Sequence, residues 1–581
     1  MLQKLSQPLH ATIFALLASS GAILRCLSAH QEESACTTVE SQNEELEVVV
    51  NTTKGRVKGF ITNSSQGKAV RVFYGVPYAK PPIGMLRFSL PVPNDPWTGV
   101  FNATVKPNSC VQTVDDTYGN FSGSVMWNAN TNMSEDCLKL NVWTPVSSSK
   151  KPLAVLVWIY GGGFYSGTST LDVYDARNLV SEEDVIVVSM NYRVASLGFL
   201  SFGNELVPGN AGLYDQCMAL KWVRDNIAAF GGDPNRVTLF GESAGAVSVA
   251  MHVLSPLSRG LFERVVLQSA SAVAPWGFKT NETAREAARR LAHALCCPEE
   301  LDNETLSCLR DRDPKEIVYN ETNDGGVVDF AFVPVEDGHF LQKSPQALIA
   351  EKAFLTNISV MLGSNLNEGS YFLQYFFGFS ATDQNPNITE KNFTAAVKAL
   401  NPTSGEPPMA EVLKQYSKGV VPSTPEDMLV ALDSIVGDYH FTCPVVQWAD
   451  IFMQAGVAVY EYVFARRASR DPWPRWIGVM HGAEVAFVFG EPFNGTLEYD
   501  PDDKTVSSRM MRYWANFAKT GDPNLPENGT LYNSTWPRRT NHSREHLVLD
   551  VNETVGCAHR ASYCEFWQSI QNNWTRPTTS C

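Results

Sequence analysis

The chain has 581 residues, 44% of them hydrophobic, and a formal net charge of −15 at pH 7. So acidic a chain lacks the basic surface that nucleic-acid binding requires, which argues against nucleic acid as a partner. The hydrophobic share is ample for a large core, and no linker-like tract or internal repeat divides the chain, so we expect one large domain with long insertions.

The N-terminus has the features of a secretory signal peptide, which we place at 1–29. Lys4 supplies a basic start, the apolar stretch 11–24 is too short to span a bilayer comfortably, and small residues at 27–29 offer a cleavage site. An N-terminal membrane anchor is the alternative interpretation. No other segment resembles a transmembrane helix, so we expect a secreted, extracellular protein. Sequons recur along the chain and predict glycosylation, among them Asn51, Asn102, Asn281, Asn320, Asn357, Asn392, Asn494 and Asn552.

Runs of apolar, β-prone residues mark the predicted strands of the first half, at 139–145, 153–163, 185–193, 237–243 and 264–271. Continuous apolar stretches are typical of strands buried on both faces, and therefore of a largely parallel sheet. Helical patterns such as 215–230 lie between them, and two later strands are predicted at 358–365 and 457–464. This alternation predicts an α/β architecture, with the stretches around 280–355 and 375–455 as insertions.

A glycine-rich turn follows the second of these strands, in WIYGGGFYSG (158–167). Three consecutive glycines after a strand resemble the oxyanion-hole motif of lipases and esterases, with Tyr160 in place of the histidine. The backbone N–H groups of Gly162 and Gly163, with that of Ala244, would stabilise a developing oxyanion. A flexible glycine hinge is the alternative.

The stretch TLFGESAGAVSV (238–249) places Ser243 between a predicted strand and a predicted helix. Gly-Glu-Ser-Ala-Gly in that setting fits the nucleophile elbow, in which the glycines allow a tight turn and close backbone approach. The following helix points its positive N-terminus toward the serine. The five-residue pattern recurs by chance, so the strand–turn–helix setting is what favours a nucleophile over an ordinary turn.

A serine nucleophile needs a base, and in this kind of fold the acid and then the histidine follow the serine along the chain. The chain has 10 histidines, and His542, His546 and His559 lie in polar sequence that we expect to be exposed. His481 lies between an aromatic-rich segment and an apolar run, and the need for a base favours it over a packed core histidine. Glu368 follows a predicted strand and precedes a glycine, which is a suitable loop position for the acid.

The chain contains 12 cysteines, which in an oxidising compartment are expected to form disulfides, although spacing alone does not give their connectivity. The last residue, Cys581, lies in a polar tail that we place at 566–581, after a catalytic domain at 30–565. A terminal cysteine in a secreted chain suggests a disulfide-linked homodimer, and a free thiol is the alternative.

Five blocks of sequence resemble the cholinesterase and type-B carboxylesterase family: SEDCLKLNVWTP (134–145), GGGFYSG, FGESAGA, NEGSYF and HGAEVAFVFG. The resemblance extends from about Val49 to Cys564 and implies an α/β-hydrolase fold with a catalytic triad of Ser243, Glu368 and His481. It further implies the disulfides Cys110–Cys137, Cys297–Cys308 and Cys443–Cys564, and structural ion pairs of Arg87 with Glu135 and of Arg193 with Asp215.

The same resemblance implies a cleft for a choline ester. Trp127, in the loop closed by the first disulfide, matches the tryptophan that binds the quaternary ammonium of choline by cation–π attraction. Packing alone is the alternative for an isolated tryptophan. The other matched positions are the site carboxylate, the aromatic wall and the rim of the cleft: Glu242, Tyr371, Phe372, Asp115, Tyr165 and Tyr375.

The acyl pocket is matched by Trp276, Val328 and Phe330. Acetylcholinesterases of the family have phenylalanines at the last two positions, and valine at the first of them enlarges the pocket. Because one methylene discriminates by only about 1–3 kcal/mol, we expect acetylcholine hydrolysis with appreciable butyrylcholine turnover.

The sequence contains no metal-ligand pattern such as His-Glu-X-X-His, and the predicted mechanism requires no cofactor. The prediction is therefore a secreted serine hydrolase that cleaves choline esters. A broad-specificity carboxylesterase, in which Trp127 only packs, is the enzymatic alternative. An adhesion protein of the same fold, forming no acyl-enzyme, is the non-enzymatic one.

Overall fold

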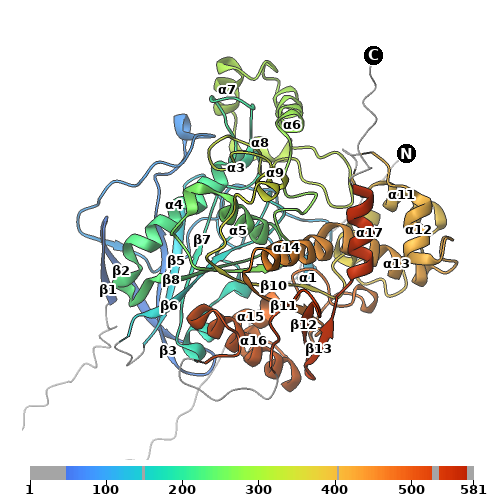
Figure 1. Ribbon diagram of the computed structural model, residues 1–581. Helices are drawn as coiled ribbons and strands as arrows, with labels where there is room; N and C mark the ends of the chain where they lie inside the picture. The colour runs from blue at the N-terminus through green and yellow to red at the C-terminus, as the bar shows by residue number, and fades with distance from the viewer. Residues whose placement is uncertain (1–47, 147–150, 402–404, 527–534, 572–581) are drawn as a thin grey trace, which may run out of the picture. The chain divides into compact units, whose positions relative to one another are not determined.

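A computed structural model describes residues 48–146, 151–401, 405–526 and 535–571 (Figure 1). The predicted signal peptide, Cys36 and Cys581 lie outside these residues, so the proposed intersubunit disulfide stays a prediction. The strands are β1 Val48–Thr52, β2 Gly55–Asn63, β3 Ala69–Pro77, β4 Val100–Asn102, β5 Lys139–Pro145, β6 Leu153–Ile159, β7 Ile186–Met190, β8 Gly232–Glu242, β9 Arg264–Gln268, β10 Ser359–Asn365, β11 Ala458–Phe464, β12 Glu545–Leu549 and β13 Thr554–Cys557.

The helices of the described residues fall into two groups. Those of the first half are α1 Ser122–Val125, α2 Arg177–Glu183, α3 Ala195–Phe199, α4 Ala211–Asn226, α5 Ala244–Leu254, α6 Asn281–Ala294, α7 Asn303–Arg310, α8 Pro314–Tyr319 and α9 Pro345–Ala350. Those of the second half are α10 Ser370–Phe377, α11 Glu390–Lys398, α12 Met409–Ser417, α13 Pro425–Gly437, α14 Cys443–Gln454, α15 Val485–Phe489, α16 Pro501–Thr520 and α17 Ala561–Gln571.

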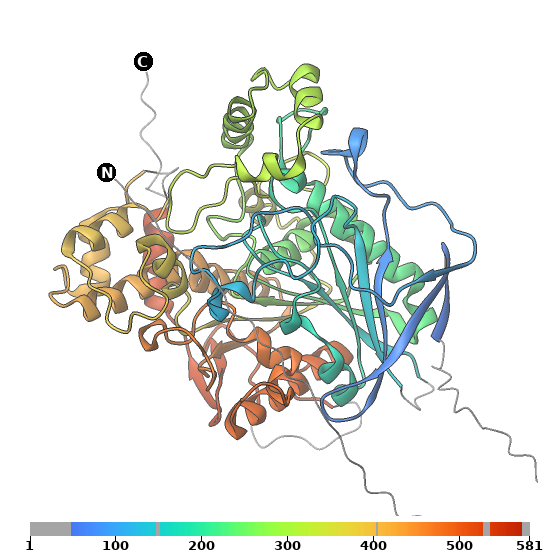
Figure 2. The ribbon, with the colours of Figure 1, turned by 180° about the vertical axis from the view of Figure 1, so that it is seen from behind.

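The strands form one sheet in the order β1-β2-β3-β5-β7-β6-β8-β9-β10-β11-β12-β13, with β4 beside β2. From β7 to β12 every neighbouring pair is parallel, and antiparallel pairs complete both ends. Helices α4, α5 and α14 cover one face, and α2, α15 and α16 cover the other (Figures 1 and 2). Because helices cover both faces, the central strands are buried along their length, which confirms the predicted α/β-hydrolase architecture.

Strand β5 departs from the prediction. Its residues are almost all buried, as the apolar run 139–145 indicated, but it pairs antiparallel with both β3 and β7. Burial on both faces requires apolar residues whichever way the strand runs, so the composition of β5 could not reveal its direction.

The parallel arrangement gathers the predicted catalytic segments at one edge of the sheet. The glycine turn follows β6, Ser243 follows β8, and Glu368 lies three residues after β10 ends at Asn365. Carboxyl ends of parallel strands meet at the same edge, where ligand sites of open α/β sheets form. The segment that carries His481 is held beside the Glu368 loop by a backbone hydrogen bond of 3.0 Å from Asn367 to Val479.

The three disulfide pairings implied by the family resemblance are confirmed. Cys443–Cys564 joins α14 to α17, and α17 continues to Gln571, past the boundary predicted at 565, with Trp567 buried. Among the described residues, Cys217, Cys296 and Cys557 form no disulfide. In the same part of the chain, no helix combines the length and the apolar character needed to cross a bilayer.

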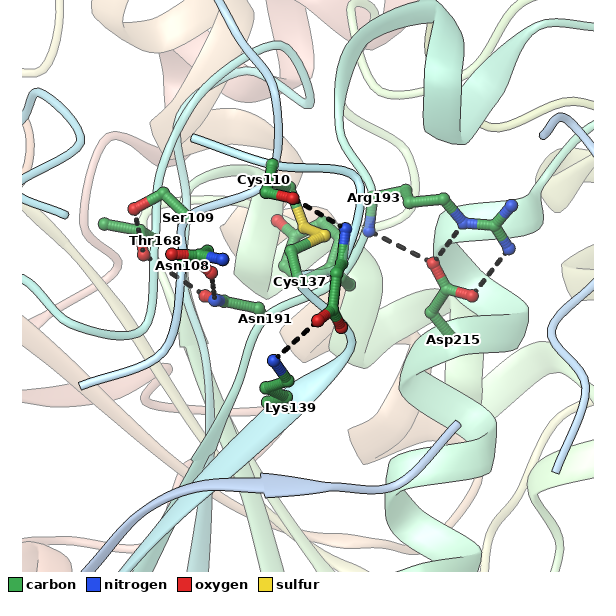
Figure 3. The surroundings of a disulfide bond; sticks show 12 residues. Asn108, Ser109, Cys110, Cys137, Lys139, Thr168, Asn191, Arg193 and Asp215 are labelled. Carbon is green, nitrogen blue, oxygen red and sulfur yellow. Dashed lines mark hydrogen bonds and ion pairs between the residues drawn. A yellow bond between two sulfur atoms is a disulfide. The ribbon is translucent and has the colours of Figure 1, made fainter. Parts of the chain in front are cut away.

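The Cys110–Cys137 disulfide closes the loop that contains Trp127, and Figure 3 shows the residues around this bond. Ser109 donates a hydrogen bond of 3.0 Å to Thr168, and Asn191 donates one of 2.8 Å to the Asn108 carbonyl. Nearby, the predicted Arg193–Asp215 ion pair is present with an N–O distance of 2.7 Å, as is the Arg87–Glu135 pair. These contacts place the tryptophan loop and the oxyanion turn in one rigid unit.

Candidate active site

Ser243 occupies the sharp turn between β8 and α5. Its backbone has φ 56° and ψ −123°, a conformation that L-residues rarely adopt and that is found at functional turns. The flanking glycines permit it, because a Cβ atom added at Gly245 would lie 1.9 Å from the carbonyl oxygen of Ile159. The side chain is therefore presented at the first turn of α5, as the nucleophile-elbow motif predicts.

His481 and Glu368 form a close pair beside this turn. His481 Nδ1 lies 2.6 Å from Glu368 Oε2, and Glu368 Oε1 accepts the backbone N–H of Asn365 at 2.7 Å. Both side chains are almost fully buried, so the carboxylate can hold one imidazole orientation and stabilise the charged imidazolium. The second ring nitrogen, Nε2, has no hydrogen-bond partner in the described part of the chain and lines the same cavity as Ser243.

A second carboxylate, Glu242, approaches the other side of the imidazole. Its Oε1 lies 3.1 Å from His481 Nε2 without hydrogen-bond geometry. Burial raises the pKa of Glu242 to about 8, while His481 opposes that rise. Burial by itself would lower the pKa of His481, but Glu242 and Glu368 outweigh it and raise the pKa. The imidazole and Glu242 therefore titrate as one coupled group.

Replacing Glu242 with glutamine is expected to move the acidic limb of the pH profile of kcat/KM to lower pH. The base works only when neutral, and Glu242 is a group that raises the pKa of His481, so its loss lets the imidazole deprotonate at lower pH. The profile is measured with acetylthiocholine from pH 5 to 9. Glu316→Gln, on an exposed face of α8, is the control, and a limb that stays in place or moves to higher pH contradicts the coupling.

The glycine turn supplies backbone donors opposite the serine. Gly162 and Gly163 have φ values of 106° and 58°, which only glycine adopts without strain. Within the described residues their N–H groups donate to no other residue, and the Ala244 N–H is the first of α5, which lacks a partner in the helix. All three predicted oxyanion donors thus lie around the Ser243 turn.

One cavity of about 120 Å³ joins the nucleophile, the base and the predicted cation site. Its walls contain Asp115, Trp127, Gly162, Gly163, Tyr165, Glu242, Ser243, Phe330, Tyr371, Phe372 and His481. Trp127 and Glu242 flank Gly482, since a Cβ atom there would lie 3.6 Å from the indole and from Glu242 Oε1. The indole therefore shares the cavity of the nucleophile instead of facing away from it.

A wider cavity of about 390 Å³ adjoins the first and shares with it Asp115, Tyr165, Phe330, Tyr371 and Phe372. Tyr375 lies here, and its hydroxyl donates a hydrogen bond of 2.6 Å to Asp115 Oδ2. The Tyr371 hydroxyl is 3.3 Å from that of Tyr375. The predicted rim residues are thus linked into one polar chain at the edge of the aromatic wall.

The predicted acyl pocket is only partly assembled. Trp276 and Phe330 pack edge to face with ring centroids 5.5 Å apart, and Phe330 presses on Gly163. Val328, expected beside them, is buried and lines the wider cavity, not the one that contains Ser243.

Phe441 is an aromatic neighbour of the Glu368–His481 pair that the sequence did not indicate. Its ring lies 4.4 Å from that of His481 and 5.7 Å from that of Trp276, so it packs between the imidazole and the predicted acyl-pocket tryptophan. Phe441 lies on a π-helical turn at 438–442, between α13 and α14. Such turns often accompany functional sites, but an apolar residue in a helical insertion has no local signal that separates it from core.

Comparisons with known proteins agree with this geometry. The sequence profile described as "Carboxylesterase family" matches residues 46–567. The chain is 41% identical to acetylcholinesterase of Electrophorus electricus over 556 residues, which cover 90% of this chain and 88% of that protein. It is 42% identical to cholinesterase of Mus musculus over 539 residues, which cover 92% of this chain and 88% of the relative. The chain belongs to the carboxylesterase family and is a carboxylic ester hydrolase.

Proposed function

We propose that this chain is a secreted serine hydrolase that cleaves choline esters through an acyl-enzyme intermediate. The observation that carries the proposal is the single cavity in which Trp127, Glu242, Ser243 and His481 meet. Neither lysine nor arginine is among the described residues that line this cavity or the wider one beside it. An aromatic, carboxylate-bearing cleft without cationic side chains suits a quaternary ammonium ester.

In this proposal the substrate enters past Asp115 and Tyr375 into the aromatic cavity. The trimethylammonium group lies against the indole of Trp127 and the ring of Tyr371, near Glu242. Cation–π attraction contributes about 2 kcal/mol when the cation is desolvated, as it is within this cavity. Binding the cation there leaves the ester carbonyl facing the Ser243 turn and the glycine N–H groups.

His481 Nε2 then removes the proton of Ser243 as the hydroxyl oxygen attacks the carbonyl carbon. Glu368 holds the imidazole through Nδ1 and stabilises the imidazolium. Gly162, Gly163 and Ala244 donate hydrogen bonds to the tetrahedral oxyanion, each contributing about 3 kcal/mol to lowering the barrier. Choline leaves with the proton from His481, and a water molecule activated by the same nitrogen hydrolyses the acyl-enzyme.

Comparing a charged ester with its neutral isostere tests the function. Acetylthiocholine is expected to have a higher kcat/KM than its uncharged isostere, 3,3-dimethylbutyl thioacetate, by about thirtyfold, the equivalent of about 2 kcal/mol. Equal values for the charged and neutral esters would favour a broad-specificity carboxylesterase. No turnover of any ester and no pre-steady-state burst would favour the adhesion alternative.

The acyl preference is a separate prediction. Butyrylthiocholine is expected to reach at least about a tenth of the acetylthiocholine kcat/KM, because, of the two matched positions, Phe330 lines the cavity of Ser243 while Val328 lines the wider cavity beside it. That tenfold difference is about 1.4 kcal/mol, within the range of about 1–3 kcal/mol by which a pocket discriminates a methylene. Phe330→Leu is expected to raise the butyryl-to-acetyl ratio, since Phe330 lines the inner cavity next to Gly163. A wild-type ratio below about 1%, equivalent to more than about 2.7 kcal/mol, would overturn the prediction of appreciable butyrylcholine turnover.

Secretion belongs to the same proposal. The eight sequon asparagines named above are each partly or fully exposed, as glycan attachment requires. Expression in cells with a secretory pathway is expected to place the esterase in the medium, with an N-terminus near residue 30. Activity confined to the cell lysate would contradict it.

A further inference from the structure

Asp433, on α13, is a buried carboxylate that forms no ion pair with any residue that the structure describes. Its side chain is 9% exposed, and Asp438, also negative, is the charged neighbour that bears on it. Burying a carboxylate without an opposite charge is costly unless hydrogen bonds compensate. Hydrogen bonds do so here: Oδ2 accepts the side-chain N–H of Asn367 at 2.8 Å, Oδ1 accepts the backbone N–H of Gly369 at 3.0 Å, and the backbone N–H of Ser370 also stabilises the carboxylate.

Asn367 and Gly369 flank Glu368 in the sequence, so Asp433 holds the acid loop on both sides of the acid. The helix also supports this loop through close backbone contact. A Cβ atom added at Gly369 would lie 2.4 Å from the carbonyl oxygen of Asp433, and one at Gly437 would lie 3.3 Å from Cβ of Glu368. Glu368 therefore rests directly on the end of α13.

Asn367 extends the contact from the acid loop to the base. The side-chain oxygen of Asn367 accepts the backbone N–H of Val479 at 2.9 Å. The backbone N–H of Asn367 donates to the Val479 carbonyl at 3.0 Å. Val479 is two residues before His481. The hydrogen-bond series Asp433–Asn367–Val479 thus connects α13 with both loops of the Glu368–His481 pair.

We propose that Asp433 is a positioning residue that sets the geometry of the Glu368–His481 pair through Asn367 and Gly369. This rests on the proposed function, because it assigns the pair to catalysis. Asp433 touches neither substrate nor the reacting atoms. Its carboxylate oxygens accept hydrogen bonds from Asn367 and Gly369, the residues on either side of Glu368. Small displacements of a catalytic pair have large effects on rate.

Replacing Asp433 with asparagine exchanges one of its two acceptor oxygens for a donor NH₂ group. In Asp433→Asn the new amide can accept the Gly369 N–H with its oxygen, but its NH₂ group then faces the NH₂ group of Asn367. Rotating the Asn367 amide removes that conflict and turns its NH₂ group against the Val479 N–H. One donor in the series is left unpaired in either arrangement.

Exchanging the two side chains restores every hydrogen bond. In the double variant Asp433→Asn/Asn367→Asp, the amide at 433 accepts from Gly369 and donates to the carboxylate at 367. The other oxygen of that carboxylate accepts the Val479 N–H. The net charge of the double variant equals that of the wild type, and both variants lack the aspartate at 433, so any difference between them comes from the carboxylate at 367 and the hydrogen bonds that it restores.

The experiment measures kcat and KM for acetylthiocholine at pH 8. Burial raises the pKa of Asp433 to about 7, so the carboxylate is ionised there. Asp433→Asn is expected to lower kcat about tenfold with KM changed less than about threefold, and the exchanged pair to recover kcat to within about threefold. Asp427→Asn, an exposed aspartate on the same helix, is the matched control and is expected to behave like the wild type.

A wild-type kcat in Asp433→Asn overturns the proposal. So does an exchanged pair that folds but stays as slow as the single variant. If Asp433→Asn does not fold, the exchanged pair is compared with the wild type, and a kcat about tenfold below the wild type overturns the proposal. Amide hydrogen exchange at Gly369 and Val479 gives a reading that needs no turnover: faster exchange in the single variant and wild-type exchange in the pair support the proposal. Absent turnover in the wild type counts against the proposed function alone, and the exchange rates still test the hydrogen-bond series.

Discussion

Ser243→Ala is expected to lower kcat for acetylthiocholine by about 10⁵-fold or more, the scale seen when a serine hydrolase loses its nucleophile. The hydroxyl is the group in this cavity that can form the acyl-enzyme, and the imidazole and oxyanion donors have nothing to act on without it. Steady-state assays give the loss of turnover. Intact mass spectrometry after incubation with an organophosphate is expected to show one adduct on the wild type and none on the variant.

Ser248→Ala is the matched control, because Ser248 is buried in α5, the helix that follows Ser243, and accepts a hydrogen bond from the side chain of Gln216. It is expected to retain both turnover and labelling. Stoichiometric labelling of Ser243→Ala at the active site would mean that another residue is the nucleophile. Loss of labelling in both variants would point to damage to α5 and not to the chemistry.

Trp127→Ala is expected to lower kcat/KM for acetylthiocholine by about thirtyfold or more, corresponding to the loss of about 2 kcal/mol of cation–π attraction. The uncharged isostere is expected to lose less than about threefold, since its tert-butyl group gains little from the ring quadrupole. The effect appears as a fall in the ratio of the two kcat/KM values, which cancels any general loss of active enzyme.

Trp97→Ala serves as the control, because Trp97 is also half-buried but lies on Gly55, away from both cavities. It is expected to change both esters equally. If Trp127→Ala lowers the charged and neutral esters by the same factor, the indole supports the wall of the cavity and does not bind the cation. The enzyme would then fit the broad-specificity alternative.

The residues of the proposed catalytic triad carry sequence signals of different strength. Ser243 carries a local signal, because an apolar strand, two glycines and a helix-forming run together demand a strained turn. His481 was chosen largely by elimination, and one step of that elimination was wrong: His546 is buried in β12, beside the backbone of Gly556, and not exposed. Polar flanking sequence did not reveal that the strand would be covered.

Several contacts around the site could not be predicted from the sequence. Val328 and Phe330 are two residues apart and were expected in one pocket; both line the wider cavity, but of the two Phe330 alone reaches the cavity of Ser243. Phe441 comes to His481 from a π-helical turn far along the chain, and Asp433 reaches the acid loop from the preceding helix. The residues next to Phe441 and Asp433 in the sequence do not indicate that either side chain lies beside the Glu368–His481 pair.

The sequence by itself determined the α/β class, the strained turn at Ser243 and the glycine turn after β6. These depend on local backbone requirements and on the apolar burial of strands, which nearest neighbours in the chain dictate. The tertiary structure alone decided the direction of β5, the place of Val328 and the contacts of Phe441 and Asp433. Side-chain packing between distant segments depends on how insertions fold back over the sheet, and no local pattern encodes that path.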